Sequence, residues 1–481
     1  DELANQPELL APLLTAVGEI YFRLGVYDKS EVSLGEALVA ARESNQPEAE
    51  GEVLLKLGWT LLEQKKIAEA EPVLLQALNI GRSLQGNQHV FLARVLESVS
   101  QLRFEQGELV EAESNAREGL ALLQAEPDQR LAAQLQHQLG VVLMQRSDYQ
   151  GAETALRQAL SARRSILPEA HPEIATNLAN LAYLMSATGR YEEAVQLYRE
   201  TLASYRNVLG DDHPWVGRTL AGLASSLRSG GQFVESEALH RQVLALHSKN
   251  LGDAHVEVAM AYNDLGRVIQ DQGRLDEAEA LYLEALKRYP QDHRWRTATL
   301  RNLATVYEAR GELVKAADAH RELLASDVAS YGMDHDRVAL SEALLGGVLV
   351  RLNRTEEAEP MLLHASSIFE NKLPANHPRH ALVSLPIGQI LCMRSEFEEA
   401  GRYLTRAREL RLQHYGTDDQ RTAEADLALG TCLAAEGRAG EALPHLANAD
   451  RVFRAGHNFR QAEATSAFNS VSESAAFTDH Q

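Results

Sequence analysis

The sequence predicts an all-α solenoid, built from about eleven helix-turn-helix units stacked in chain order. Three observations predict it. Hydrophobic residues make up 45% of the 481 residues but aromatic residues only 6%, so the apolar content is mostly Leu, Ala and Val, which suits closely packed helices. A small residue recurs about every 42 positions. A residue suited to a tight turn follows all but one of these small residues by seven positions.

The recurring small residue marks the first helix of each unit, here called helix A. Successive anchors are 38 to 42 residues apart, and a fixed period of this size is the signature of a repeat architecture. The anchors define eleven units and are Gly18, Gly58, Ser100, Gly140, Ala182, Ala224, Gly266, Ala304, Gly346, Gly388 and Gly430.

The end of helix A is predicted seven residues after each anchor. Most of these positions hold glycine or asparagine, which tolerate the left-handed conformation that ends a helix, and only Lys65 is unfavourable there. Small residues return twelve and nineteen positions after the anchor, as Ala278 and Ala285 do in the seventh unit. They would let a second helix, helix B, pack closely against helix A, so each unit is predicted to be a helical hairpin.

These hairpins resemble the tetratricopeptide repeat, most clearly in "LGRVIQDQGRLDEAEALYLEAL" (265–286) and "LAYLMSATGRYEEAVQLYRETL" (181–202). The links LGDDHP (209–214), LGDAHV (251–256), LPEAHP (167–172) and LPANHP (373–378) resemble the longer kinesin light chain type. The resemblance implies a right-handed superhelix whose A helices line a concave groove. We expect the solenoid over residues 1–455, a capping helix over 456–471 and a loose tail over 472–481.

A histidine precedes most anchors by eleven residues. We expect these imidazoles to pack on the turn and bond free backbone groups where helix A begins. Stacked repeats would hold equivalent side chains roughly 10 Å apart, whereas zinc needs ligands within about 2 Å, so no metal site is expected. The histidines are His89, His171, His213, His255, His293, His335 and His377, with Gln129 and Asp419 in the same place in two other units.

The sequence carries no motif for catalysis or for a cofactor, and we expect neither. A net charge of −21 argues against nucleic-acid binding, because phosphate recognition needs a positive face. The longest apolar run, residues 343–350, is too short to span a bilayer, so no membrane insertion of this segment is expected. The two cysteines, Cys392 and Cys432, are expected to be buried free thiols, with a single bridge between them as the alternative.

The resemblance places the functional surface on helix A, at positions −6, −3, +1, +4 and +5 from the anchor. In units five to eight these positions and their neighbours are rich in arginines and amides, which suit carboxylates and the backbone of an extended peptide. We therefore expect a protein or peptide partner of acidic character. The predicted groove residues are Thr176, Asn180, Tyr183, Arg218, Ser225, Arg228, Asn263, Arg267, Gln270, Arg301, Asn302 and Thr305.

Two further points about the groove stay open at this stage. The resemblance implies that asparagines such as Asn180, Asn263 and Asn302 hold the main chain of a bound segment, but the arginines could instead pair with groove acids such as Asp271 and Glu308. Apolar residues take the same positions toward both ends and would be buried either in the superhelix or against a second copy in a homodimer. They are Leu55, Trp59, Leu62, Leu340, Val350, Leu382, Leu385, Cys392 and Met393.

Residues 1–43 resemble the start of the repeat region that follows the kinase domain, and often a membrane span, in bacterial serine/threonine kinases. The resemblance implies the sensing or docking region of a receptor kinase, on the periplasmic side of the inner membrane. The 481 residues hold no kinase motif, so phosphoryl transfer would belong to a separate domain. A free-standing cytoplasmic adaptor is the second interpretation, and an enzyme with unrecognised motifs is the third.

Overall fold

The computed structural model describes residues 6–84, 88–290, 293–456 and 460–478. In these ranges it contains 23 α-helices and no strand. The chain divides into two compact units, Asp1–Leu239 and His240–Gln481, here called unit 1 and unit 2. The boundary falls inside α12, within the stretch for which the sequence predicts one continuous solenoid. Because each hairpin of a repeat stack contacts only its neighbours, no single core has to extend over the whole chain.

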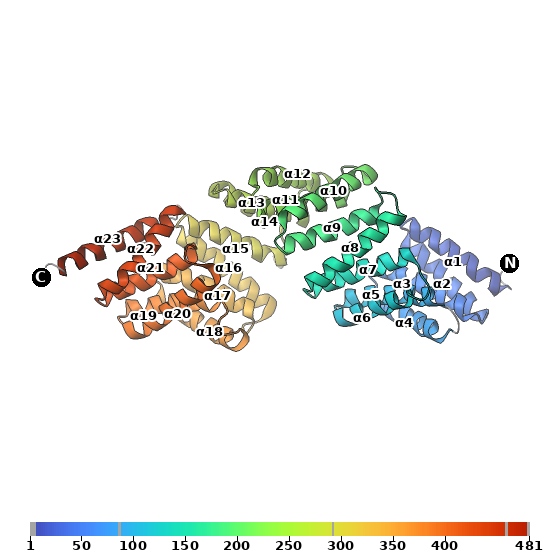
Figure 1. The fold of residues 1–481 in the computed structure, drawn as a ribbon, viewed down its shortest axis with the longest axis horizontal. Helices are drawn as coiled ribbons and strands as arrows, with labels where there is room; N and C mark the ends of the chain where they lie inside the picture. The colour runs from blue at the N-terminus through green and yellow to red at the C-terminus, as the bar shows by residue number, and fades with distance from the viewer. Residues whose placement is uncertain (1–5, 85–87, 291–292, 457–459, 479–481) are drawn as a thin grey trace. The chain divides into compact units, whose positions relative to one another are not determined.

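Unit 1 consists of successive helical hairpins (Figure 1). Its helices are α1 (Pro7–Arg23), α2 (Tyr27–Glu43), α3 (Pro47–Glu63), α4 (Ile67–Ser83), α5 (His89–Gln106), α6 (Leu109–Leu122), α7 (Gln129–Gln145), α8 (Tyr149–Ile166), α9 (Pro172–Ala187), α10 (Tyr191–Leu209), α11 (Pro214–Ser229) and the first part of α12 (Phe233–Leu251). The anchors of unit 1 all lie in odd-numbered helices, which are therefore the A helices.

Unit 2 continues the same order of A and B helices. After the rest of α12 it contains α13 (Val256–Asp271), α14 (Leu275–Arg288), α15 (Arg294–Ala309), α16 (Leu313–Tyr331), α17 (Asp336–Arg351), α18 (Thr355–Lys372), α19 (His380–Met393), α20 (Phe397–Tyr415), α21 (Gln420–Ala435), α22 (Ala439–Ala455) and α23 (Gln461–Thr478). The predicted all-α fold of stacked hairpins is confirmed. No helix in the described ranges is both long and apolar enough to cross a membrane.

The turn between helix A and helix B lies where the sequence predicts it. The residue seven positions after each anchor has a positive φ in all eleven hairpins, from 58° at Asn353 to 90° at Gly437. Lys65 also adopts this conformation, with a φ of 60°, although a residue with a Cβ atom pays roughly 1–2 kcal/mol there. The repeat geometry therefore overrides the local preference of the lysine.

The small residues let the two helices of each hairpin touch. The residue twelve positions after every anchor is completely buried, as Ala278 is in the seventh hairpin. In unit 2, a Cβ atom on Gly346 of α17 would lie 2.7 Å from Cγ of Leu362 on α18, too close for real atoms. Where serine replaces alanine, as at Ser30, its hydroxyl donates to the carbonyl oxygen of the anchor Gly18 at 2.9 Å. The polar substitute therefore leaves no buried hydroxyl unpaired.

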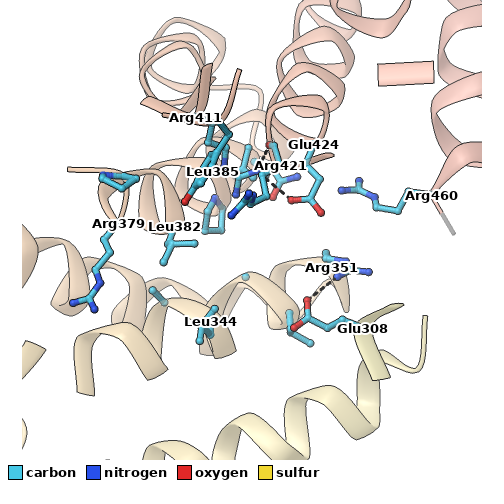
Figure 2. A pocket seen from close by; sticks show the side chains of 17 residues that line it. Glu308, Leu344, Arg351, Arg379, Leu382, Leu385, Arg411, Arg421, Glu424 and Arg460 are labelled. Carbon is cyan, nitrogen blue, oxygen red and sulfur yellow. Dashed lines mark hydrogen bonds and ion pairs between the residues drawn. The ribbon is translucent and has the colours of Figure 1, made fainter. Parts of the chain in front are cut away.

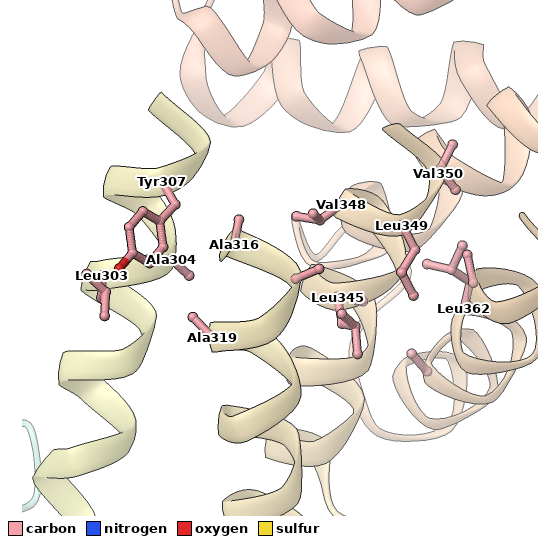
Figure 3. Close-up of a cluster of buried hydrophobic side chains, with 14 of the residues drawn as sticks. Leu303, Ala304, Tyr307, Ala316, Ala319, Leu345, Val348, Leu349, Val350 and Leu362 are labelled. Carbon is pink, nitrogen blue, oxygen red and sulfur yellow. The ribbon is translucent and has the colours of Figure 1, made fainter. Parts of the chain in front are cut away.

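One cluster of buried side chains in unit 2 passes through the successive helices from α13 to α19. Figure 3 shows Tyr307 of α15, Ala316 of α16, Leu345 and Leu349 of α17, and Leu362 of α18 in a row of buried side chains. Each hairpin covers the apolar face of its predecessor, so burial of these side chains stabilises the order of stacking as well as each hairpin.

The linking histidines act as N-caps of the A helices. In α9 the backbone N–H of Glu173 donates to Nδ1 of His171 at 3.2 Å. His213, His255, His293 and His335 cap α11, α13, α15 and α17 in the same way, and His377 accepts from the N–H of Arg379. The predicted structural role of these histidines is therefore confirmed, and Asp419 caps α21 as its place in the pattern predicts.

Two predicted cap positions are wrong by one residue. Asp128, not Gln129, caps α7, because its carboxylate reaches the N–H of Leu131 at 3.0 Å and aspartate is among the strongest caps. His89 is the first residue of α5, whose N-cap is Gln88.

The C-terminal tail is more helical than predicted. The last helix, α23, extends to Thr478, so residues 472–478 are not loose, and only residues 479–481 lie outside the described range. This stretch contains no glycine or proline, and Ser472 donates to the carbonyl oxygen of Phe468 at 2.8 Å. Nothing in the sequence therefore stops the helix at residue 471.

The expected free thiols are also wrong, because Cys392 and Cys432 form a disulfide, with their Cα atoms 5.8 Å apart. The cysteines lie four and two residues after their anchors, near the ends of the consecutive A helices α19 and α21. A repeat of about 42 residues brings such positions side by side on neighbouring helices. The Cα separation is within the usual range for a disulfide.

Candidate functional site

The predicted groove residues of unit 1 lie on α9 and α11. Tyr183 is 61% exposed, and Arg218 is exposed and forms no ion pair with a described residue. Ser225 and Arg228 are half-buried. The hydroxyl groups of Thr176 and Tyr205 form a 2.9 Å hydrogen bond with each other. Tyr183 and Arg218 are therefore the side chains of this set that are most available to a partner.

Asn180 belongs to a chain of polar contacts beneath this surface. Its Nδ2 lies 3.3 Å from Nε2 of His137, and Nδ1 of His137 lies 3.4 Å from Oδ1 of Asn177. Burial lowers the pKa of His137 to about 4, assisted by the positive charge of Arg163. The imidazole is therefore neutral at pH 7, with its proton on Nδ1 and with Nε2 as the acceptor for Asn180.

In unit 2, the predicted asparagines bind each other. Oδ1 of Asn263 accepts a hydrogen bond from Nδ2 of Asn302 and another from the hydroxyl of Thr299, each at 3.0 Å. Gln270 accepts one from the hydroxyl of Tyr282 at 2.7 Å. These amides connect neighbouring helices, and a bound peptide would have to compete with them or use their remaining groups.

The arginines of this set differ in their surroundings. Arg267 forms a long ion pair with Asp264 at 3.7 Å and its side chain is 43% exposed. Burial lowers the pKa of Arg301, whose Nε is buried without a hydrogen bond among the described residues. Glu308 pairs with Arg351 at 3.2 Å and His320 at 3.1 Å. Thr305 is exposed.

A cavity of about 270 Å³ lies on the A-helix side of unit 2, in the hairpins next to this set. Its floor includes Leu344 of α17 and Leu382 and Leu385 of α19. Figure 2 shows Arg421 above the Arg351–Glu308 pair, with Leu382 to the left of both. Five arginines but only two glutamates line the cavity, and these arginines are Arg351, Arg379, Arg411, Arg421 and Arg460.

The arginines are held in place by groups around the cavity. Arg411 donates to Glu424 at 3.1 Å, and Arg379 to Asp336 at 3.3 Å. Hydrogen bonds from Arg421 to Asp419 raise the pKa of the Arg421 guanidinium, whose carbon lies 3.5 Å from the centre of the Tyr415 ring. These contacts fix the orientation of each side chain. Nε and Nη2 of Arg421 already bind both carboxylate oxygens of Asp419, so a ligand carboxylate would have to share these donors, whereas Arg379 binds Asp336 through Nη1.

Sequence reasoning missed all five of these arginines. Arg337, Arg379 and Arg421 all lie nine residues before their anchors, at the N-terminal ends of the consecutive A helices α17, α19 and α21, so the repeat itself aligns them. The groove positions that the family resemblance implies start six residues before the anchor, and therefore exclude these three arginines. Reading every helix A position unit by unit would have found the three arginines.

The apolar residues predicted near both ends of the chain are mostly buried within their own units. Leu55, Leu62, Val350 and Leu385 belong to the cores, whereas Trp59, Leu340, Leu382 and Cys392 are half-buried. Met393 is 56% exposed. In the described ranges, no group of three or more His, Cys, Asp or Glu side chains is arranged to hold a metal ion.

Comparison with solved structures finds chains of similar fold. RapI in its apo form is 14% identical and matches with a TM-score of 0.57, covering 75% of this chain and 97% of that chain. The apo form of the quorum sensor NprR from B. thuringiensis is also 14% identical, with a TM-score of 0.56 over 76% of this chain and 99% of that one. Kinesin light chain repeats from Podosopora anserina are 24% identical over 42% of this chain and 98% of that chain, with a TM-score of 0.38.

Comparison with curated protein sequences gives no match. A family model described as tetratricopeptide repeat matches residues 9–83, 131–207, 188–246, 222–291 and 292–371, more than half of the chain. Tetratricopeptide repeats form a non-catalytic scaffold. The chain belongs to the tetratricopeptide repeat family.

Proposed function

We propose that this chain is a scaffold that binds an acidic peptide or protein segment on the A-helix side of unit 2. One observation carries the proposal: Arg379 and Arg421 line the same cavity as the apolar side chains of Leu344, Leu382 and Leu385. The arginines would bind carboxylates of the segment, and an aliphatic side chain between those carboxylates would enter the cavity.

The size and the electrostatics of the cavity both suit such a ligand. A volume of about 270 Å³ is at the lower limit for small-molecule sites, so it fits a side chain better than a large cofactor. Burial lowers the pKa of Arg351, because its charge has lost solvent and is only partly compensated by Glu308. A carboxylate of the ligand would further compensate the positive charge of Arg351, and hydrogen bonds between charged groups are stronger than those between neutral groups.

The test is a titration with a fluorescein-labelled nonapeptide of alternating glutamate and leucine. Arg379→Glu combined with Arg421→Glu should weaken binding at least tenfold, about 1.4 kcal/mol. The matched control is Arg402→Glu with Arg406→Glu, which changes the charge equally at two exposed positions on the B helix α20. Equal affinity of the cavity variant and the control variant would refute the proposal, as would tighter binding of a lysine-for-glutamate version of the peptide.

For the cellular context, we propose the sensing or docking region of a bacterial serine/threonine receptor kinase, on the periplasmic side of the inner membrane. Its support is the resemblance of residues 1–43. Sequencing the gene upstream of the codon for Asp1 tests it, and a kinase domain followed by a membrane span is the expected result. An initiating methionine codon next to Asp1 would favour the alternative, a free-standing cytoplasmic adaptor. A homodimer that buries the apolar residues near the ends of the chain stays a prediction.

A further inference from the structure

Unit 1 has a larger cavity on its A-helix side, of about 460 Å³, whose chemistry is opposite to that of unit 2. Residues of four consecutive A helices line it: Phe22 of α1, Trp59 of α3, Glu97 and Gln101 of α5, and His137 of α7. Three glutamates but only one lysine are among the lining residues. A smaller cavity of about 180 Å³ shares Phe22 and Trp59 with it.

Glu97 lies in this cavity without a cation of its own. In the described part of the chain it forms no ion pair, and the nearby Arg94 is already bound to Glu52 at 2.8 Å. Burial raises the pKa of Glu97 to about 7, with smaller opposing effects of Ser98 and Arg94. A carboxylate held in this way gains from any cation that enters the cavity, because the cation replaces the solvation that burial removed.

Gln138 supplies an independent indication that the cavity binds a ligand. Its side chain lines the cavity and the residue is only 8% exposed, yet Nε2 has no hydrogen-bond partner among the described residues. An unpaired buried donor costs roughly 1–3 kcal/mol. A backbone carbonyl of a bound peptide is the acceptor that such a donor requires.

The other walls suit the same ligand. His137 is neutral and both its ring nitrogens are bonded to asparagines, so it does not repel a cation. The ring of Trp59 already attracts one guanidinium, since the Arg94 carbon lies 5.8 Å from its centre. Aromatic faces attract cations and also pack against their methylene groups.

We propose that this cavity is a second peptide-binding site, which takes a lysine or arginine side chain with Glu97 as its counter-ion and Gln138 as donor to the adjacent backbone. The proposal rests on the proposed function, because it assigns a further ligand chemistry to the same scaffold. Unit 1 would bind a basic position and unit 2 an acidic one, each with its own determinants.

The test is a titration of the full chain with an N-acetylated nonapeptide of alternating lysine and leucine. Glu97→Gln keeps the shape of the side chain but removes its charge, and it should weaken binding of this peptide at least tenfold. The matched control is Glu111→Gln, at an exposed position of the B helix α6 in the same hairpin. Gln138→Leu removes the second determinant and should also weaken binding, by a smaller factor.

The two sites can be distinguished in the same experiment. Arg379→Glu with Arg421→Glu should leave the basic peptide bound as tightly as before, even if the acidic peptide fails to bind the wild-type chain. Absence of binding by the basic peptide, or unchanged affinity of the Glu97→Gln chain, would overturn the second site and leave the proposal for unit 2 standing. Circular dichroism of each variant shows whether its helices are intact.

Discussion

Gly346 and Gly347 are neighbours in α17, but a methyl group would meet different surroundings at the two positions. A Cβ atom at 346 would lie 2.7 Å from both Cγ and Cδ2 of Leu362, whereas a Cβ atom at 347 would have nothing within 4 Å. Ordinary carbon contacts are about 3.5–4.0 Å, and Leu362 is completely buried, so it cannot move aside into solvent. Gly346→Ala should therefore overpack the hairpin, and Gly347→Ala should not.

The magnitude follows from two opposing effects. Replacing glycine by alanine inside a helix stabilises by about 0.5–1 kcal/mol, and this gain applies to both variants. Overpacking costs about 1–3 kcal/mol and applies only to Gly346→Ala. Gly347→Ala should thus be more stable than the wild type, and the two variants should differ by roughly 2 kcal/mol. In a unit of this size that difference is about 4–8 °C in melting temperature.

Thermal unfolding followed by circular dichroism gives the order of the variants. Hydrogen exchange locates the effect, because the destabilised variant should exchange faster in α17 and α18 than in distant hairpins. Equal melting temperatures, or a less stable Gly347→Ala, would refute the view that the anchor position is small because Leu362 fills the space above it.

Three other predictions concern packing, the groove and pH. Ala278 is completely buried, so Ala278→Arg should cost several kcal/mol, and an unaltered melting curve would count against the repeat alignment. Arg267→Glu should weaken binding of an acidic peptide to unit 2 severalfold, because the Arg267 side chain is 43% exposed and pairs with Asp264 only at 3.7 Å, and titration checks this. Because the pKa of Glu97 is raised to about 7, the folded state keeps a proton that the unfolded chain loses near pH 4.5, so wild-type stability falls as pH rises between these values. Glu97→Gln removes this dependence of stability on pH. The free energy of unfolding of the variant, measured with denaturant, should therefore increase relative to that of the wild type from pH 5 to pH 8. His137 has the opposite effect on stability, but it is present in both proteins and cancels in the comparison.

The fold was predictable because its determinants are local and recur. The turn residue of each hairpin, even Lys65, follows from its distance to the anchor, and the burial of Ala278 follows from a second fixed distance. The capping histidines were predictable for the same reason. The error at α7 arose because the strict spacing pointed to Gln129, whereas Asp128 is the better hydrogen-bond acceptor.

The candidate sites were less predictable, because they depend on side chains that do not repeat. Glu97 has no equivalent carboxylate in the neighbouring units, and among the described residues the nearby Arg94 forms its ion pair with Glu52 instead, which only the three-dimensional structure reveals. The disulfide of Cys392 and Cys432 depends on how far two neighbouring A helices are shifted along their axes. The row of arginines before the anchors was present in the sequence but lay outside the positions taken from the family.

Hydrogen exchange of the full chain, with and without the acidic nonapeptide, tests the central claim most directly. The account predicts slower exchange in the A helices α17, α19 and α21 around the arginine-lined cavity, and no such change in the chain carrying Arg379→Glu and Arg421→Glu. Protection confined to the B helices α18, α20 and α22, or identical protection in the variant, would contradict it.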